Sequence, residues 1–279
     1  MKRIEILTLF PEAVQSLLDS SILRRAQAKG IVELHAKDLR AFGLTKHRNV
    51  DDTPFGGGPG MLLRADVLEA ALLDTCERAG GRENVKVIYA SPRGISIAQG
   101  LCERFADWLV LGTDSFEKTD LESSAEETAD KNRHLVFVCG RYEGIDERFV
   151  EKWVDFEFSL GDFILTGGEL PSLAFVDGIV RLLPGVLGDE RSSRQESFAQ
   201  GLLEHPQYTK PRELNGVSAP EVLLEGHHLK IEEWQLRASL LLTFAFRPDL
   251  IRAHTGAGLP KWAKALLEDL KSRLELRSK

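Results

Sequence analysis

The chain carries CGRYEGIDER at residues 139–148 and SLGDFILTGGEL at residues 159–170. Each of these glycine-rich turns follows a short apolar run that is typical of a buried strand. A third turn, SPRG at residues 91–94, follows a similar run. Glycine at the carboxyl end of a strand lets backbone amides approach a ligand closely, and open parallel sheets bind ligands outside those ends. The three turns therefore predict a single ligand crevice.

Length and composition set the broad class. With 279 residues, of which 43% are hydrophobic and 28% charged, the chain can bury a sizeable core and is expected to form two domains. The three cysteines are far apart and odd in number, which argues against a disulfide framework or a cysteine-based metal site. Glu5 stands where a secretory signal would carry its apolar core, and no apolar run approaches the length of a membrane span. We expect a cytoplasmic protein without a membrane partner.

The formal net charge of −7 is unevenly distributed. Residues 1–50 hold nine Lys and Arg against five Asp and Glu, and residues 228–279 hold ten against six. Residues 114–133 instead hold seven acids and three bases. Both ends are therefore compatible with an RNA partner, although on charge alone they fit ordinary solvated helix faces equally well.

Hydrophobic periodicity alternates between strand and helix. Pro11 is expected to open one helix and Gly30 to end the next. The expected strands are 3–9, 31–36, 85–89, 135–138 and 154–158, and the expected longer helices are 65–78, 97–109, 170–183, 232–246 and 259–276. Strands that alternate with helices favour an α/β fold with a mainly parallel sheet.

Composition also suggests where the chain divides. Residues 1–187 are expected to form the larger domain and residues 201–279 a small helical one, joined by a charged and polar linker at residues 188–200. Residues 114–133 lack an apolar face, and their composition suits a flexible surface segment. They make up most of an acidic insertion, expected from about residue 107 to 132, that would repel RNA.

Familiar nucleotide and hydrolase motifs are missing. GGGPG at residues 56–60 is not followed by Lys and Ser or Thr, so it is no phosphate-binding P-loop and on its own fits a tight connection. Neither H-E-x-x-H nor G-x-S-x-G occurs, and the seven histidines have no ligand-like spacing, so we expect no metal site.

Taken together, these segments closely resemble the bacterial tRNA (guanine-N1)-methyltransferase family of the SPOUT superfamily. The resemblance follows the family's order over nearly the whole chain. It comprises ILTLFP at 6–11, RNVDDTPFGGGPGM at 48–61, YASPRG at 89–94, the two turns quoted first, PGVLG at 184–188, ESF at 196–198, HPQYTKP at 205–211 and PEVLLEG at 220–226.

The resemblance implies a fold that topology rules alone would not predict. It implies a SPOUT-type parallel sheet with a deep trefoil knot, plus a small, mainly helical C-terminal domain, although knots are otherwise essentially absent from proteins. The implied reaction transfers a methyl group from S-adenosylmethionine to N1 of the guanosine at position 37, in the anticodon stem-loop of tRNA. A homodimer with two active sites, each built from both subunits, is implied as well. Mg²⁺ stays open as a further cofactor.

The resemblance also implies which residues bind the cofactor. S-adenosylmethionine has no phosphates, so backbone groups of turns and small apolar side chains suit it. The implied contacts are Tyr89, Ser91, Pro92, Gly140, Tyr142, Glu143, Gly144, Ser159, Leu160, Gly161, Leu165, Gly167, Gly168 and Pro171. Each glycine can also be explained as a turn former, and Glu143 as a solvated acid.

Two further residues are implied to carry the chemistry. Loss of the guanine N1 proton places negative charge on O6, so the reaction needs a carboxylate at N1 and a cation at O6. The family's arginine matches Arg181, whose alternative role is an ion pair with Asp177. The family's usual aspartate is replaced here by Glu196, whose alternative is an exposed linker acid. Asp51 is a candidate RNA contact with a solvated turn as its alternative.

Two other functions compete with this interpretation. The first is another SPOUT methyltransferase that modifies ribosomal RNA or a different tRNA position, against which the 56–60 loop and the ESF linker argue. The second is an RNA-binding relative with weakened catalysis, which only the change to Glu196 favours.

Overall fold

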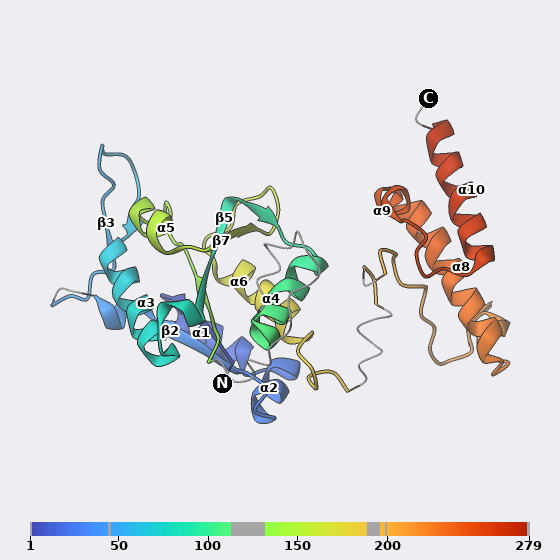
Figure 1. The fold of residues 1–279 in the computed structure, drawn as a ribbon, viewed down its shortest axis with the longest axis horizontal. Helices are drawn as coiled ribbons and strands as arrows, with labels where there is room; N and C mark the ends of the chain where they lie inside the picture. The colour runs from blue at the N-terminus through green and yellow to red at the C-terminus, as the bar shows by residue number, and fades with distance from the viewer. Residues whose placement is uncertain (1, 44–45, 113–131, 189–195, 199, 278–279) are drawn as a thin grey trace. The chain divides into compact units, whose positions relative to one another are not determined.

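The computed structural model describes residues 2–43, 46–112, 132–188, 196–198 and 200–277. The chain divides into two compact units, Met1–Gly188 and Asp189–Lys279. Figure 1 follows the chain through both units, and each is described by itself. Much of the expected linker, residues 189–195 and 199, lies outside the described residues.

A five-stranded parallel sheet forms the centre of the first unit. Its order is β2-β1-β6-β5-β7. The strands are β1 (Arg3–Thr8), β2 (Glu33–Asp38), β5 (Val85–Ser96), β6 (His134–Val138) and β7 (Phe156–Ser159). The expected α/β class with a parallel sheet is thus confirmed.

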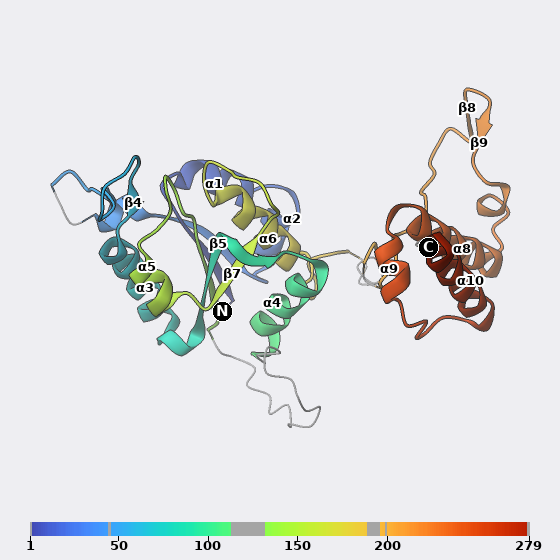
Figure 2. The same ribbon diagram turned by 90° about the horizontal axis from the view of Figure 1, so that it is seen from above.

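Helices cover both faces of this sheet, as Figure 2 shows. Val14 of α1 and Phe175 of α6 belong to the core on one face, whereas Leu68 of α3 and Phe149 of α5 belong to the core on the other. The helices are α1 (Pro11–Leu18), α2 (Ser21–Ala28), α4 (Gln99–Leu111) and α6 (Glu169–Val180) on the first face, and α3 (Ala65–Ala79) and α5 (Glu147–Trp153) on the second. Because both faces are covered, the central strand β6 is apolar along nearly its whole length, whereas the edge strand β2 alternates Leu34 and Ala36 with polar residues.

The expected end of strand β5 is wrong. The strand does not stop at Tyr89; it continues to Ser96, with a shift in its register against β7 between Ala90 and Ile95. The SPRG segment is therefore an irregularity within a paired strand, not a turn that ends it. Such bulges bend a strand and redirect its side chains, and they are frequent beside binding sites.

Helix α4 ends at Leu111 rather than at the expected residue 109. The segment expected as an acidic insertion, from about residue 107 to 132, therefore begins inside this helix. Its far end is also anchored, because Arg133 is buried and donates to the carbonyl oxygens of Trp108 at 3.2 Å and Leu111 at 3.1 Å. These bonds satisfy carbonyls that the helix end leaves free. Residues 113–131 lie outside the described residues.

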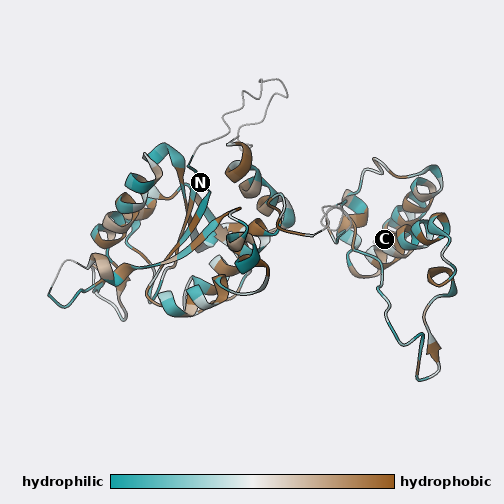
Figure 3. Cartoon of the chain, turned by 90° about the horizontal axis from the view of Figure 1, so that it is seen from below, coloured by the Kyte–Doolittle hydropathy of each residue, from teal (hydrophilic) through white to brown (hydrophobic). Residues whose placement is uncertain are grey.

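The second unit is mainly helical. It contains α8 (His228–Phe246), α9 (Pro248–Ala253) and α10 (Lys261–Arg277), with a short hairpin of β8 (Glu213–Leu214) and β9 (Val217–Ser218). Its own core comprises Leu202, Leu240, Ile251, Leu259, Ala263, Leu267, Leu270 and Leu274. Figure 3 shows hydrophobic and hydrophilic residues interspersed along these helices, as expected for a small bundle with one apolar side.

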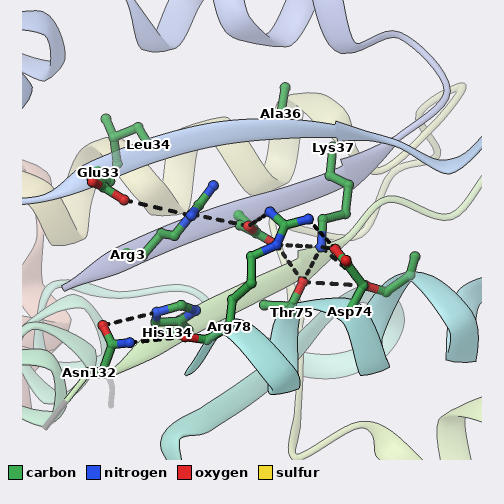
Figure 4. A network of polar contacts seen from close by, with 12 residues as sticks. Arg3, Glu33, Leu34, Ala36, Lys37, Asp74, Thr75, Arg78, Asn132 and His134 are labelled. Carbon is green, nitrogen blue, oxygen red and sulfur yellow. Dashed lines mark hydrogen bonds and ion pairs between the residues drawn. The ribbon is translucent and has the colours of Figure 1, made fainter. Parts of the chain in front are cut away.

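A buried charge network joins β1, β2 and α3 (Figure 4). Glu5 is fully buried, with Lys37 Nζ 2.9 Å from its Oε2 and Arg3 Nε 3.0 Å from its Oε1. The Thr75 hydroxyl also donates to Oε2. Burial alone would raise the pKa of Glu5, but Thr75 and Lys37 outweigh burial and hold that pKa below its usual value. His134 is buried beside the network, and burial lowers its pKa to about 4.

These two groups predict an acid-sensitive fold. The unfolded chain takes up a proton at histidine near pH 6.5, whereas folded His134 resists it down to about pH 4. Stability is therefore expected to fall as the pH drops from about 6.5 to 4, by up to roughly 3 kcal/mol, and to fall further as Glu5 is protonated. Urea unfolding across this pH range measures the loss.

His134→Gln is the matched control. It removes the titrating ring, so the pH dependence of stability above about pH 5 should become shallower. An equally steep dependence in this variant would show that other groups cause the acid sensitivity.

Candidate cofactor pocket and its family

The three glycine-rich segments meet in one pocket, at the carboxyl ends of β6 and β7 and beside the irregular middle of β5. Its volume is about 310 Å³. The expected crevice is therefore present. All of the predicted cofactor contacts line it: Tyr89, Ser91, Pro92, Gly140, Tyr142, Glu143, Gly144, Ser159, Leu160, Gly161, Leu165, Gly167, Gly168 and Pro171. That they bind a cofactor stays a prediction.

Further residues line the pocket that sequence reasoning did not select. They are Ala90, Arg141, Phe158, Phe163, Ile164 and Thr166. Phe163 and Ile164 could have been found from the sequence, because two large apolar residues in a glycine-rich loop have no core to enter. They are 56% and 82% exposed. Arg141 lies in the CGRYEGIDER motif at residues 139–148, but the local sequence does not indicate its ion-pair partner.

At the inner wall of the pocket, the turn after β6 and the loop before α6 approach each other closely through their backbones. The amide of Gly168 donates to the carbonyl oxygen of Gly140 at 2.9 Å, and Arg141 pairs antiparallel with Gly167. A Cβ atom at Gly168 would lie 2.8 Å from the Cα of Cys139, which is closer than real side chains allow. The two turns therefore touch through their backbones, and glycine is required where they do.

The pocket combines apolar surfaces with a few polar groups. Phe158, Leu165 and Pro171 supply apolar lining, and Glu143 supplies a carboxylate. Burial, and then the nearby charge of Glu157, raises the pKa of Tyr89, so its phenol stays neutral at physiological pH. Arg141 also lines the pocket, but its guanidinium is paired with the Glu169 carboxylate. The arrangement therefore suits a flat heterocycle with a cationic tail better than a phosphate ester, for which unpaired basic groups would be needed.

The carboxyl end of the glycine-rich loop at residues 56–60 lies against the same side of the pocket, since a Cβ atom at Gly60 would meet the Glu143 side chain. The loop connects the short strands β3 (Asp51–Asp52) and β4 (Leu62–Leu63). The Glu143 amide donates to the Met61 carbonyl at 3.0 Å, and the Leu63 amide donates to the Gly144 carbonyl at 3.0 Å. This loop is thus more than a connection, because its end pairs with a turn that forms the pocket.

Asp51 and the two proposed catalytic residues lie outside this pocket. Asp51 is on β3, and its neighbour Asp52 lines a second cavity of about 710 Å³ between the hairpin, α3 and α5. Arg181 caps the carboxyl end of α6 in the first unit. Glu196 is partly buried in the second unit, so its separation from Arg181 is not defined.

Sequence comparison decides the family. A model of the tRNA (Guanine-1)-methyltransferase TrmD family matches residues 1–131 and 119–253. The chain belongs to this family. Proteins named tRNA (guanine-N(1)-)-methyltransferase from Staphylococcus carnosus and Bacillus subtilis are 42% and 43% identical to it, over 99% and 90% of this chain and 100% and 93% of their own lengths. One from Ruegeria pomeroyi is 45% identical over 89% of this chain and 92% of its own length.

The tRNA (guanine-N1)-methyltransferase family assignment extends over both units of the chain. Among the residues that the structure describes, no group of three or more His, Cys, Asp and Glu side chains is placed to hold a metal ion. The described helices also include none that is long and apolar enough to cross a membrane.

Proposed function

We propose that this protein transfers the methyl group of S-adenosylmethionine to N1 of the guanosine at position 37 of tRNA. Family membership supports methyl transfer to a tRNA guanine as the class of reaction, because near-full-length relatives bear the name tRNA (guanine-N(1)-)-methyltransferase. Bacterial tRNA matures in the cytoplasm, which is the proposed location.

The cofactor is proposed to bind in the pocket formed by the three glycine-rich segments. Bound there, S-adenosylmethionine would supply an electrophilic methyl group on a cationic sulfur. Glu143 is the carboxylate in the pocket lining that suits its positive charge, and the apolar residues Leu165 and Pro171 suit its adenine. The antiparallel pairing of Arg141 with Gly167 brings together two loops that a SPOUT knot would interlace, and this supports the proposed trefoil knot.

The tRNA is proposed to reach the pocket from its open side. The glycine-rich loop that ends at Gly60, together with Asp51 on the strand before it, would contact the anticodon stem-loop. The second unit, residues 201–279, is proposed to bind tRNA, which the surplus of Lys and Arg at residues 228–279 supports.

Two side chains are proposed to act on the guanine. Arg181, which lies away from the pocket of its own subunit, would act at an active site built from both subunits and stabilise the negative charge that develops on O6. Glu196 would accept the N1 proton. Glutamate keeps the carboxylate of the family's usual aspartate and adds one methylene group of reach.

The product gives a direct test of the reaction. Unmodified bulk tRNA incubated with the protein and S-adenosylmethionine should yield 1-methylguanosine, identified by mass spectrometry of the digested nucleosides. Methylation of another base or of ribose would place the protein elsewhere in the superfamily. Cofactor binding without any tRNA product would favour a catalytically weak RNA-binding relative.

The protein is predicted to be a homodimer. Leu160, Phe163, Ile164 and Leu170 are 37%, 56%, 82% and 61% exposed within one short segment, and such a group of exposed apolar side chains is typical of an interface. Sedimentation equilibrium should therefore give twice the mass of the chain, and Ile164→Asp should weaken the dimer. A fully active monomer at working concentration would contradict this prediction.

A further inference from the structure

Glu169 is a buried carboxylate beside the pocket that does not itself line it. It lies in the first turn of α6 and is 7% exposed. Arg141 Nε donates to its Oε1 at 3.1 Å, and Arg141 Nη2 lies 2.9 Å from its Oε2. The Thr8 hydroxyl at the end of β1 also donates to Oε1, at 2.9 Å. Burying a carboxylate is costly unless it is paired, so this group holds its partners closely.

Arg141 connects this carboxylate to the pocket. Its Nη1 donates to the carbonyl oxygen of Thr166 at 3.2 Å, and both residues line the pocket. The ring of Phe10 lies against the guanidinium, 4.3 Å from ring centroid to Cζ, and covers it from the side of β1. The pair thus ties the turn after β6 to the loop before α6 and to the end of β1.

Gly167 is the point at which the backbone passes this ion pair. A Cβ atom there would lie 2.6 Å from Glu169 Oε2 and would also collide with the Arg141 side chain. The loop backbone therefore fits directly against the ion pair only because residue 167 has no side chain.

We propose that Glu169 is a positioning residue. Through its ion pair with Arg141, it holds the turn after β6 and the loop before α6 in the arrangement that binds S-adenosylmethionine. When the pocket is already formed, the cofactor binds without the entropic cost of ordering loops. When the pocket is loosened, that cost weakens cofactor binding. This inference rests on the proposed cofactor site.

The test is calorimetric binding of S-adenosylmethionine to the full chain. Glu169→Gln keeps the side-chain shape but leaves Arg141 without its charge partner, so the Kd should rise about tenfold or more. Glu69→Gln is the matched control, because it makes the same change in an exposed ion pair with Lys152. Its Kd should stay within about twofold of the wild type.

Binding to the folded protein separates positioning from simple stabilisation. A merely structural Glu169 would lower the melting temperature and leave the Kd unchanged below it. The effects of Arg141→Met and Glu169→Gln on the Kd should also be non-additive in the double variant, because each substitution removes the same ion pair.

Thr8→Val provides a milder variant that adds no charge. It removes one hydrogen bond from Glu169 and the one that the Thr8 hydroxyl accepts from the Phe10 amide. Thr8→Val should raise the Kd for S-adenosylmethionine by about threefold. If Glu169→Gln does not fold, the proposal is tested with Thr8→Val alone. An unchanged Kd in the folded variant overturns the proposal. Failure of the wild type to methylate tRNA, with cofactor binding intact, would instead overturn the proposed function alone.

Discussion

Glu196→Gln is expected to slow methyl transfer by about 10²- to 10⁴-fold, the range that general base catalysis contributes. Glutamine keeps the shape of the side chain but cannot take the N1 proton from guanine. Affinity for S-adenosylmethionine should be unchanged, because Glu196 is not among the residues that line the pocket. A single-turnover assay with saturating tRNA measures the chemical step.

Glu196→Asp is the matched control for this variant. It shortens the side chain, keeps the carboxylate and restores the residue that the family usually has, so it should remain active. If Glu196→Gln instead turns over like the wild type between about pH 6 and 9, the base lies elsewhere. Asp189 and Glu190 are then the next candidates in the same segment, outside the described residues.

Arg181→Ala is expected to reduce turnover by about 10²- to 10³-fold, the usual cost of removing one donor that stabilises developing negative charge. Arg181 caps the end of α6, away from the residues that line the pocket. The variant should therefore bind S-adenosylmethionine normally and melt near the wild-type temperature.

Asp177→Asn distinguishes catalysis from a structural ion pair. If Arg181 served chiefly to pair with Asp177, this variant should lose as much activity and dimerisation as Arg181→Ala. Near-normal activity in Asp177→Asn, with a large loss in Arg181→Ala, supports a role at O6. Equal losses of dimerisation and turnover in both variants would contradict it.

The two catalytic proposals are linked. A carboxylate in water is a weak base for guanine N1, so proton transfer is uphill in solution. Closing the site over bound tRNA would remove water from Glu196 and strengthen it as a base, while a cation at O6 would make N1 more acidic. The losses in Glu196→Gln and Arg181→Ala should therefore not add in the double variant.

The pocket could be predicted from the sequence because its determinants are local. Glycine-rich turns after apolar runs mark the carboxyl ends of strands, and those ends share one edge of a parallel sheet. The turns that hold Gly140 and Gly161 were identifiable in this way, and the structure brings them together around one pocket. The individual cofactor contacts, Tyr89 among them, were implied only by the family resemblance.

Other features depend on contacts between distant segments and could not be predicted. The pairing of β5 with β7 carries the strand through Ser91 to Gly94, which look like a terminating turn in isolation. The partnership of Arg141 with Glu169 joins residues 28 positions apart that only the folded sheet edge brings together. Arg133 follows an acidic stretch of sequence, which suggests a position on the surface. Its hydrogen bond to the end of α4 depends on the folded chain and does not show in the local sequence.

Methyl transfer from labelled S-adenosylmethionine to two tRNA transcripts tests the proposed function most directly. The transcripts differ only in carrying guanosine or adenosine at position 37. Label should enter the first transcript, at N1 of that guanosine, and be absent from the second. Equal labelling of both transcripts, or of neither while the protein binds the cofactor and tRNA, would contradict the proposed function.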